Sequence, residues 1–273
     1  MSWLLKSDAG LIDIGVNLTH SSFDNILTST IRRAKNACIT KLIITGTSEQ
    51  ESAHSLDICR DFSINFPNMI YSTCGVHPHN AKEFNNETAG NLKKIASNNQ
   101  VVAIGETGLD FNRNFSSPKE QQIAFESQLE LASELQLPVF LHERDAHERQ
   151  LEILKHYRKS LKNAVIHCFT GTKDELFNYL DLDLYIGITG WICDERRGQE
   201  LQKIVKNIPI NRLMIETDAP FLLPRTIESV SKKQINEPAF LPWIVREISN
   251  HRSESMLKIA KETTKNATFF FNL

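Results

Sequence analysis

The sequence contains no apolar run long enough to cross a membrane, and its first residues predict no secretory signal because Lys6 and Asp8 interrupt a short apolar stretch. Its five cysteines are an odd number, are widely spaced and form no CxxC pair. This usage favours free thiols in a reducing compartment over a disulfide framework or a zinc ribbon. We therefore expect a cytoplasmic protein, or a nuclear one in a eukaryote, with no membrane partner.

The chain also lacks an excess of basic residues. Its 31 lysines and arginines against 33 aspartates and glutamates give a formal charge of −2 at pH 7, so no global positive field surrounds it. A nucleic-acid partner would have to be held by local Arg and Lys groups or by a bound cation. This balance argues against a protein that passively coats DNA.

Several nucleotide-binding and hydrolase motifs are missing as well. The sequence has no GxGxxG, Walker A or GxSxG pattern, so dinucleotide binding, NTP hydrolysis and serine hydrolase chemistry lack their usual support. Cys168 and Cys193 have no neighbouring basic pattern of the kind that activates a thiol. We interpret both as small buried residues rather than nucleophiles.

What the sequence does contain is a series of eight short apolar runs, separated by stretches long enough for one helix each. This pattern predicts an α/β fold, the TIM (β/α)8 barrel, with a doubly wound sheet as the competing architecture. No linker rich in Gly, Ser or Pro divides the chain, so we interpret residues 1–273 as a single domain, with a polar loop at 228–242 and closing helices within 243–271. The predicted strands are residues 11–16, 39–46, 68–75, 101–105, 138–141, 164–166, 184–188 and 212–215.

Metal-capable side chains follow four of these runs. Glu106 comes directly after the fourth run, and His142, His167 and Asp218 follow the fifth, sixth and eighth. A barrel brings the carboxyl ends of all its strands to one mouth, whereas an open sheet spreads them along an edge. Any one of these residues alone would be an ordinary turn residue. Together they form a mixed N/O set that suits a divalent cation such as Mg²⁺, Mn²⁺ or Zn²⁺, without selecting among the three.

The segment GVHPH at 75–79 adds two histidines after the third run. Pro78 stiffens the turn and biases His77 towards an extended conformation. We interpret His77 as a metal ligand or as a proton donor near the scissile group. His79 is a candidate substrate contact, with capping of the following helix as its alternative role.

Two arginines and two aromatic residues are candidates to contact a substrate. Arg144 lies two residues beyond His142, where its guanidinium could hold a phosphate oxygen in a bidentate pair, and Arg113 could do the same. Surface ion pairs with neighbouring carboxylates are the alternative for both. Trp191 or Phe111 could stack on bases without regard to sequence.

A metal-capable cluster without a nucleophilic Ser or Cys motif favours hydrolysis by metal-activated water. Asp218 is the last carboxylate at the predicted mouth, and we interpret it as the general base and an additional ligand. Glu106 and His77 complete the predicted catalytic set.

Seven sequence blocks stand out in order along nearly the whole chain: DIGVNLT (13–19), GVHPH (75–79), AIGETGLDFNRNFS (103–116), PVFLHERDAHE (138–148), IHCFTGT (166–172), YIGITGWICDERRG (185–198) and LMIETDAPFLLPR (213–225). Together they resemble the TatD family of metal-dependent deoxyribonucleases, and most of all its TatD branch. The resemblance implies a TIM barrel of the metal-dependent hydrolase group and Mg²⁺-dependent 3′ to 5′ exonuclease activity on single-stranded DNA. It further implies RNA as a second substrate, a part in DNA repair, and metal or catalytic roles for Glu106, His142, His167 and Asp218, with His77 as the family's GxHP histidine.

One departure from the family pattern concerns the first strand. Most of the family has an Asp-x-His-x-His pattern there, whose two imidazoles bind a second metal, whereas this chain has Gly15 and Asn17 at those positions. Neither residue can replace an imidazole fully. We therefore expect one well-held metal on Glu106 and the two histidines after the fifth and sixth runs, with Asp218 on the water and any second ion weak or substrate-dependent.

Two other functions fit the same residues. One is a metal-dependent amide or ester hydrolase on the same barrel, which a substrate panel would separate from a nuclease. The other is a non-catalytic interaction protein that keeps the fold, which the missing histidines of the first strand allow. In each case we expect a monomer.

Overall fold

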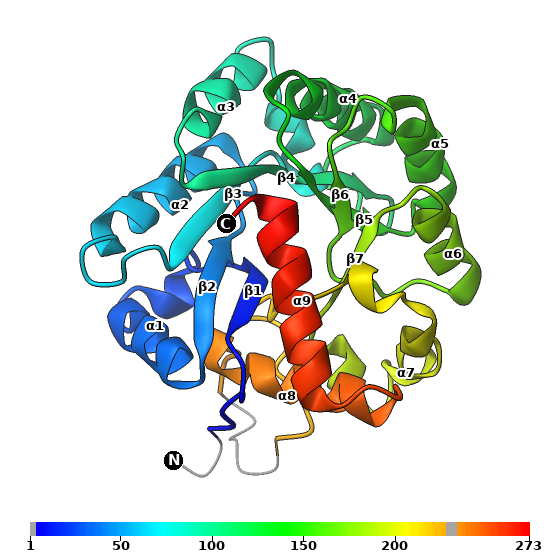
Figure 1. Cartoon of the computed structure of the whole chain (residues 1–273). Coiled ribbons are helices and arrows are strands. Elements are labelled where there is room, and N and C mark those ends of the chain that lie inside the picture. Colours follow the sequence, from blue (N-terminus) through cyan, green and yellow to red (C-terminus); the bar gives the residue numbers. More distant parts are fainter. Residues whose placement is uncertain (1–3, 228–233) are drawn as a thin grey trace.

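Eight parallel strands form one sheet in the computed structural model of the chain, which describes residues 4–227 and 234–273. Their order follows the sequence, and the sheet closes where β8 meets β1, since the backbone N–H of Asp218 donates to Gly15 O at 2.9 Å. The predicted TIM barrel is confirmed and the doubly wound alternative is wrong. The strands are β1 (Leu11–Val16), β2 (Ile39–Ile44), β3 (Ile70–Cys74), β4 (Val101–Asp110), β5 (Val139–Arg144), β6 (Ala164–Ile166), β7 (Tyr185–Ile188) and β8 (Leu213–Ile215) (Figure 1).

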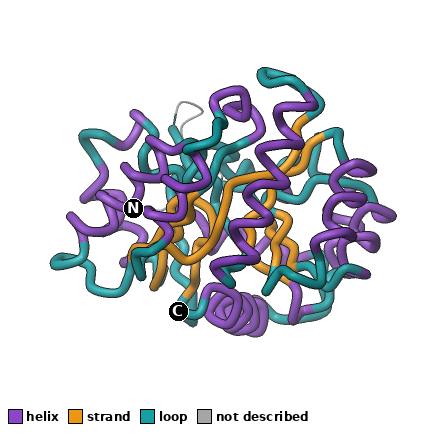
Figure 2. Tube along the Cα trace, turned by 90° about the horizontal axis from the view of Figure 1, so that it is seen from above, coloured by secondary structure: helices purple, strands orange, loops and turns teal. Residues whose placement is uncertain are grey.

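Helices surround the strands on the outside of the barrel (Figure 2). Local signals set where they begin: Ser117 and Glu120 form a reciprocal capping box at the start of α4, and Pro118 occupies its first turn, where no backbone N–H is needed. The helices are α1 (Leu27–Asn36), α2 (Glu49–Phe62), α3 (Thr88–Ala96), α4 (Pro118–Leu135), α5 (His147–Tyr157), α6 (Lys173–Asp181), α7 (Gln199–Ile204), α8 (Leu241–Asn250) and α9 (Met256–Phe271).

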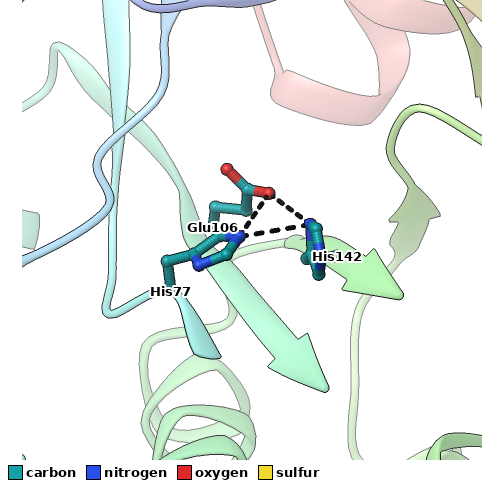
Figure 3. Close-up of side chains that lie close together, drawn as sticks. All are labelled: His77, Glu106 and His142. Carbon is teal, nitrogen blue, oxygen red and sulfur yellow. Dashed lines mark hydrogen bonds and ion pairs between the residues drawn. The ribbon is translucent and has the colours of Figure 1, made fainter. Parts of the chain in front are cut away.

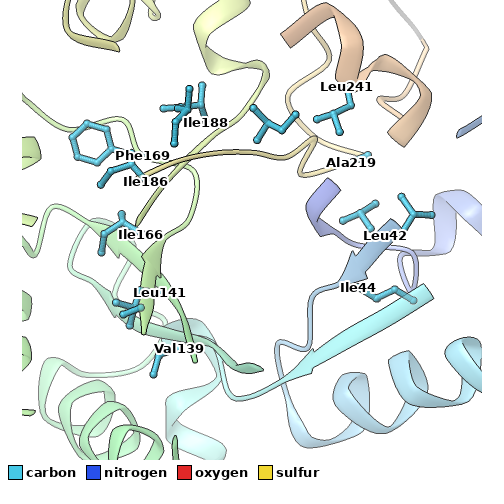
Figure 4. Packing of buried hydrophobic residues seen from close by; sticks show 14 of the residues in the cluster. Leu42, Ile44, Val139, Leu141, Ile166, Phe169, Ile186, Ile188, Ala219 and Leu241 are labelled. Carbon is cyan, nitrogen blue, oxygen red and sulfur yellow. The ribbon is translucent and has the colours of Figure 1, made fainter. Parts of the chain in front are cut away.

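Two apolar layers follow from the alternation of side chains along each strand. On β5, Val139 and Leu141 belong to the layer between strands and helices, while Phe140 belongs to the layer inside the barrel. The outer layer continues around the barrel through Ile166 and Ile186 (Figure 4). Burying each such side chain contributes about 1.5–3 kcal/mol. The same alternation turns inwards the residues two positions beyond Phe140, Val165 and Met214, where the site is built.

The amino ends of the strands are closed by α9, which lies across that end of the barrel (Figure 1). Ala267, Phe270 and Phe271 of this helix pack with the inner layer. Side chains of α9 also fix it to the strand ends, as Asn266 Nδ2 donates to Leu213 O at 2.8 Å. With this end filled, the carboxyl end is the open one. The closing helices predicted within 243–271 are confirmed as α8 and α9, while part of the predicted loop at 228–242 lies outside the described residues.

β4 contains a bulge that changes the direction in which the Glu106 side chain points. Between β4 and β5, Ile104 pairs with Val139 but Thr107 pairs with Leu141, so β4 has one extra residue. Such a bulge bends the strand and shifts its in–out alternation. Gly105 supplies the conformation, with φ of +137°, and a Cβ there would lie 2.2 Å from Phe140 O.

Two predicted strand ends are therefore wrong. Pairing of β4 with β5 continues beyond the bulge as far as Asp110 and Arg144. Glu106 and His142 consequently lie inside strands rather than just after them, which holds both side chains on rigid backbone.

Two predictions from what the sequence lacks can be compared with the structure. The five cysteines are all free, as predicted. Within residues 4–227 and 234–273, no helix is long and apolar enough to cross a membrane.

Candidate metal centre

Glu106 is the hub of a carboxylate–imidazole cluster at the open end of the barrel. Its Oε1 lies 2.8 Å from His142 Nδ1, 3.3 Å from His167 Nε2 and 3.4 Å from His77 Nε2. Figure 3 shows His77, from the loop after β3, and His142, from β5, converging on this carboxylate. The structure thus places two predicted ligands, His142 and His167, against Glu106, together with His77, for which a ligand role was one of the two interpretations.

The donor set fits a divalent cation. The ligand atoms of His77, Glu106 and His142 lie within 4.8 Å of one another, and two ligands that share one ion at about 2.1 Å are at most about 4.2 Å apart. The three measured separations, including 3.3 Å between His77 Nε2 and His142 Nδ1, satisfy that limit. These three residues form a possible metal site.

The electrostatics of the cluster favour positive charge beside Glu106. Burial alone would raise the pKa of this carboxyl, but the facing imidazoles hold it well below its usual value. Burial alone would lower the pKa of His167, yet Glu216 and Glu106 raise it well above its usual value. Glu106 and Glu216 thus favour the protonated form of His167. A divalent cation that binds this imidazole would displace its proton.

Glu216, which was not among the candidate residues of the sequence, orients His167 from the side away from Glu106. The carboxylate is fully buried, its Oε2 lies 2.8 Å from His167 Nδ1, and its Oε1 accepts the backbone N–H of Cys168 at 2.6 Å. A carboxylate behind a metal-ligating imidazole fixes the ring and its tautomer, leaving Nε2 free to face the ion. The signal for Glu216 was the alternation on β8, since Met214 points into the barrel.

Two glycines make room for this carboxylate. A Cβ at Gly15 would lie 2.4 Å from Glu216 Oε2, and a Cβ at Gly187 would lie 2.5 Å from its Oε1. Side chains at these positions would displace Glu216. Gly15 is therefore more than a lost ligand, because the absence of its side chain leaves the space that holds Glu216.

Capping of the helix after the GVHPH turn falls to His77 rather than to His79. The Nδ1 of His77, not a group of His79, caps the 3-10 helix Pro78–Glu83 by accepting the backbone N–H of His79 at 3.0 Å. The geometry explains this, since the extended conformation that Pro78 imposes on His77 suits an N-cap residue. The helix-cap alternative for His79 is wrong.

Asp110, which was also not among the candidate residues of the sequence, contacts the rings of both His79 and His142. Its Oδ2 lies 2.7 Å from His79 Nε2 and 3.4 Å from His142 Nε2, and its side chain is 1% exposed. Gln121, buried on α4, holds the Asp110 backbone through its amide at 2.8 and 2.9 Å. The end of β4 is thereby fixed beneath His79 and His142.

Asp218 lies at the opposite side of the centre. Burial raises the pKa of this carboxyl to about 7, and the charges of Glu106 and Glu216 act in the same direction. Its side-chain hydrogen bond is with Asn17, whose Nδ2 donates to Oδ1 at 2.9 Å. Asn17 thus holds Asp218 from the position where most of the family has a histidine.

The loop that carries Asp218 is anchored from beneath by Asp13. This fully buried carboxyl accepts the backbone N–H of Thr217 at 2.8 Å and lies 2.5 Å from the Thr217 hydroxyl. Burial raises the pKa of Asp13 to about 8. A second anchor is Asn236, whose Nδ2 donates to Thr217 O at 2.9 Å.

The predicted substrate contacts differ in how free they are. Arg144 and Arg113 are exposed, and neither guanidinium forms an ion pair within the described part of the chain. The ion-pair alternative is thus not observed. Trp191 is less free, because Arg197 covers its ring at 4.3 Å. Phe111 packs against the hydrophobic core.

A closed (β/α)8 barrel with a buried carboxylate among imidazoles at its open end is the arrangement of a barrel hydrolase that works with a metal. Comparison with known proteins makes the class specific. The family model described as TatD related DNase matches residues 12–272, and the chain belongs to this family. The resemblance found in the sequence blocks is thereby confirmed.

Individual relatives extend over nearly the whole chain. The "3'-5' ssDNA/RNA exonuclease TatD" of Erwinia tasmaniensis is 51% identical over 96% of this chain and 100% of its own length. The protein of the same name from a Rahnella species is 49% identical over 96% of this chain and 98% of its own. Among solved structures, the TatD homologue YjjV of Escherichia coli K12 has a TM-score of 0.86 at 25% identity, covering 96% of this chain and 98% of that one.

Proposed function

We propose that this protein is a metal-dependent 3′ to 5′ exonuclease that hydrolyses phosphodiester bonds in single-stranded DNA and RNA. The observation that carries the proposal is the cluster of three imidazoles around Glu106 Oε1, all within 3.4 Å of it. Relatives about half identical over nearly the full length bear the name of such an exonuclease. We further propose that residues 1–273 act as one catalytic domain and as a monomer, with a part in DNA repair.

The cation would be held by Glu106 and His142, with His77 as the ligand whose nitrogen lies close to both and His167, 3.3 Å from Glu106, as the further ligand expected from the sequence. When bound, it would supply positive charge at a phosphoryl oxygen and make water more acidic. Mg²⁺ is the ion that the family resemblance favours, with Mn²⁺ and Zn²⁺ as alternatives. We retain the proposal of one well-held ion, because Asn17 forms a hydrogen bond with Asp218.

The remaining residues have distinct proposed roles. Asp218, with a pKa near 7, can take a proton from the attacking water at neutral pH. Burial lowers the pKa of His77 to about 4, so its ring is neutral at pH 7, which favours the ligand role over that of proton donor. Arg144 and Arg113 are free to contact flanking phosphates, and His79, which lies beside Asp110 and Phe115, is a further candidate contact.

The two competing functions have less support. Barrel neighbours of other activities, such as a dihydropyrimidinase at 13% identity, share the fold and no more. A non-catalytic protein would have no need to keep Glu216 fully buried behind His167 or to keep Asp218 beside the cluster.

The test is digestion of a 5′-labelled single strand with Mg²⁺, with and without EDTA, by the wild type and by Glu106→Ala. We expect a ladder that shortens from the 3′ end and disappears with EDTA or with the substitution. Glu254→Gln is a matched control, since Glu254 pairs with Arg252 before α9 at the closed end of the barrel. Activity that survives EDTA, or products that shorten from the 5′ end, would contradict the proposal. Cleavage of amide or ester substrates instead of nucleic acid would favour the competing hydrolase.

A further inference from the structure

Two exposed phenylalanines lie next to the metal centre, and neither was singled out in the sequence. Phe115 is 55% exposed in the loop between β4 and α4, and Phe221 is 50% exposed in the loop after β8. A single exposed apolar residue is ordinary on a protein surface. These two differ from the others because each lies in a loop that follows a strand and meets the imidazole of a histidine in another such loop.

Phe115 is joined to the centre through a series of rings. Its ring meets that of His79 edge to face, with centroids 4.8 Å apart and planes at 85°. The His79 ring in turn lies 4.4 Å from His77, and His77 lies 4.4 Å from His142. Phe115 is therefore two ring contacts away from a side chain that faces Glu106.

Phe221 has the corresponding position beside the proposed base. Phe221 is three residues beyond Asp218 in the sequence, and its backbone N–H donates to Asp218 O at 3.0 Å, which holds it close to this residue. Its ring meets His20 edge to face at 5.4 Å. The strand order places β4 and β8 across the barrel from each other, so the two phenylalanines flank the centre from opposite sides.

Resting on the exonuclease function proposed above, we propose that Phe115 and Phe221 are stacking platforms for the two nucleobases on either side of the cleaved phosphate. Each base has a π-face, so stacking holds a strand without reading its sequence. Two adjacent bases must separate from each other to lie on rings at opposite sides of the centre, which favours a single strand over a duplex. Stacking also supplies attachment that a chain of net charge −2 does not gain from a general positive field.

The experiment measures binding as well as cleavage, with short labelled single strands that have an abasic site at the 3′-terminal or at the penultimate position. Dissociation constants are measured by fluorescence anisotropy in EDTA, and kcat/KM is measured with Mg²⁺. For the wild type, we expect each abasic site to weaken binding by about 5- to 150-fold, the range for one stacked base. Phe115→Ala should lose sensitivity to one abasic position and Phe221→Ala to the other.

Conservative variants and a distant control separate stacking from other effects. Phe115→Trp should keep the dependence on the base, while Phe115→Leu, apolar but without a ring, should lose it. Phe269→Ala is the matched control, because Phe269 is 69% exposed on α9 at the closed end. If the wild type and the alanine variants lose equal affinity at each abasic site, the stacking role is wrong. If binding depends on the base but no strand is digested, stacking stands and the exonuclease function fails.

Discussion

Replacing Glu216 by Gln would test whether the carboxylate behind His167 controls metal binding. Glu216 uses both oxygens as acceptors, one facing the His167 Nδ1 position at 2.8 Å and the other accepting from Cys168 N at 2.6 Å. Glutamine has nearly the same shape but only one acceptor oxygen. In either orientation of the amide, an N–H group must then face a donor.

The expected loss of metal affinity depends on whether the amide N–H of the new glutamine faces His167 or Cys168. If it faces His167, the ring must accept there and move its own proton to Nε2, the atom that faces Glu106 at 3.3 Å. If it faces Cys168, a buried backbone N–H loses its acceptor. Carboxylates that orient metal-ligating histidines are worth about 10- to 100-fold in metal affinity, or about 1.4–2.7 kcal/mol. We expect a loss in this range for Glu216→Gln.

The assay is titration of the protein with Mn²⁺, with free ion measured by electron paramagnetic resonance, together with thermal unfolding in EDTA. Glu254→Gln, which also removes a carboxylate from a paired position, should bind Mn²⁺ as the wild type does. An unchanged Mn²⁺ affinity in a folded Glu216→Gln protein would refute the orienting role. A variant that is destabilised in EDTA to the same degree as it loses affinity would point to folding instead.

Three other substitutions test neighbouring parts of the structure. The pKa of Asp13 is near 8 in the folded protein and about 3.8 in the unfolded chain. The free energy of unfolding should therefore fall as the pH rises from about 4 to 8, by at most about 1.4 kcal/mol per pH unit. Asp13→Asn should remove this pH dependence in urea titrations. The amide of Asn17 lowers the pKa of Asp218, so Asn17→Ala should move the acidic limb of the kcat profile to higher pH, whereas an unmoved limb would contradict the proposed base. Gly15→Ala should lower Mn²⁺ affinity through Glu216, and combining it with Glu216→Gln should cost less than the sum of the two, while additive losses would show that the positions act separately.

The strands and most of the carboxylate–imidazole cluster could be predicted from the same pattern in the sequence. Apolar runs that end on polar residues mark the strands, and a barrel brings their carboxyl ends together. Residues 164–166 and the position of His167 needed nothing more than this. Glu216 was also within reach, since it is two residues beyond Met214, which points into the barrel.

The aim of Glu106 could not be predicted in the same way. Simple alternation from Ala103, which lies in the inner layer, would turn Gly105 inwards and Glu106 towards the helices. The extra residue on β4 reverses this outcome, and it depends on a glycine at φ +137° packed against Phe140. A bulge of this kind is set by contacts with the neighbouring strand, which the order of residues in β4 does not contain.

Contacts between distant loops were the second limit. Phe115 and His79 come from loops after different strands, and only the assembled barrel shows that their rings meet at 4.8 Å. Trp191 was the more obvious aromatic candidate from the sequence, but the guanidinium of Arg197 lies over its ring. Which aromatic residue is free to stack is decided by what covers each face, and this information exists only in the fold.

Gly15 has two effects: it removes a histidine ligand that most of the family has, and it leaves space for Glu216. As a missing histidine it argues for a single well-held ion, and as a residue without Cβ it leaves space in which Glu216 reaches His167. Asn17, two residues further on, donates a hydrogen bond from its side-chain amide to Asp218. The two substitutions in the first strand therefore act on opposite sides of one centre, Gly15 on a histidine that faces Glu106 and Asn17 on the proposed base. The single ion proposed above leaves the orientation of its ligands and of the proposed base to the protein itself, and these two residues contribute to that orientation.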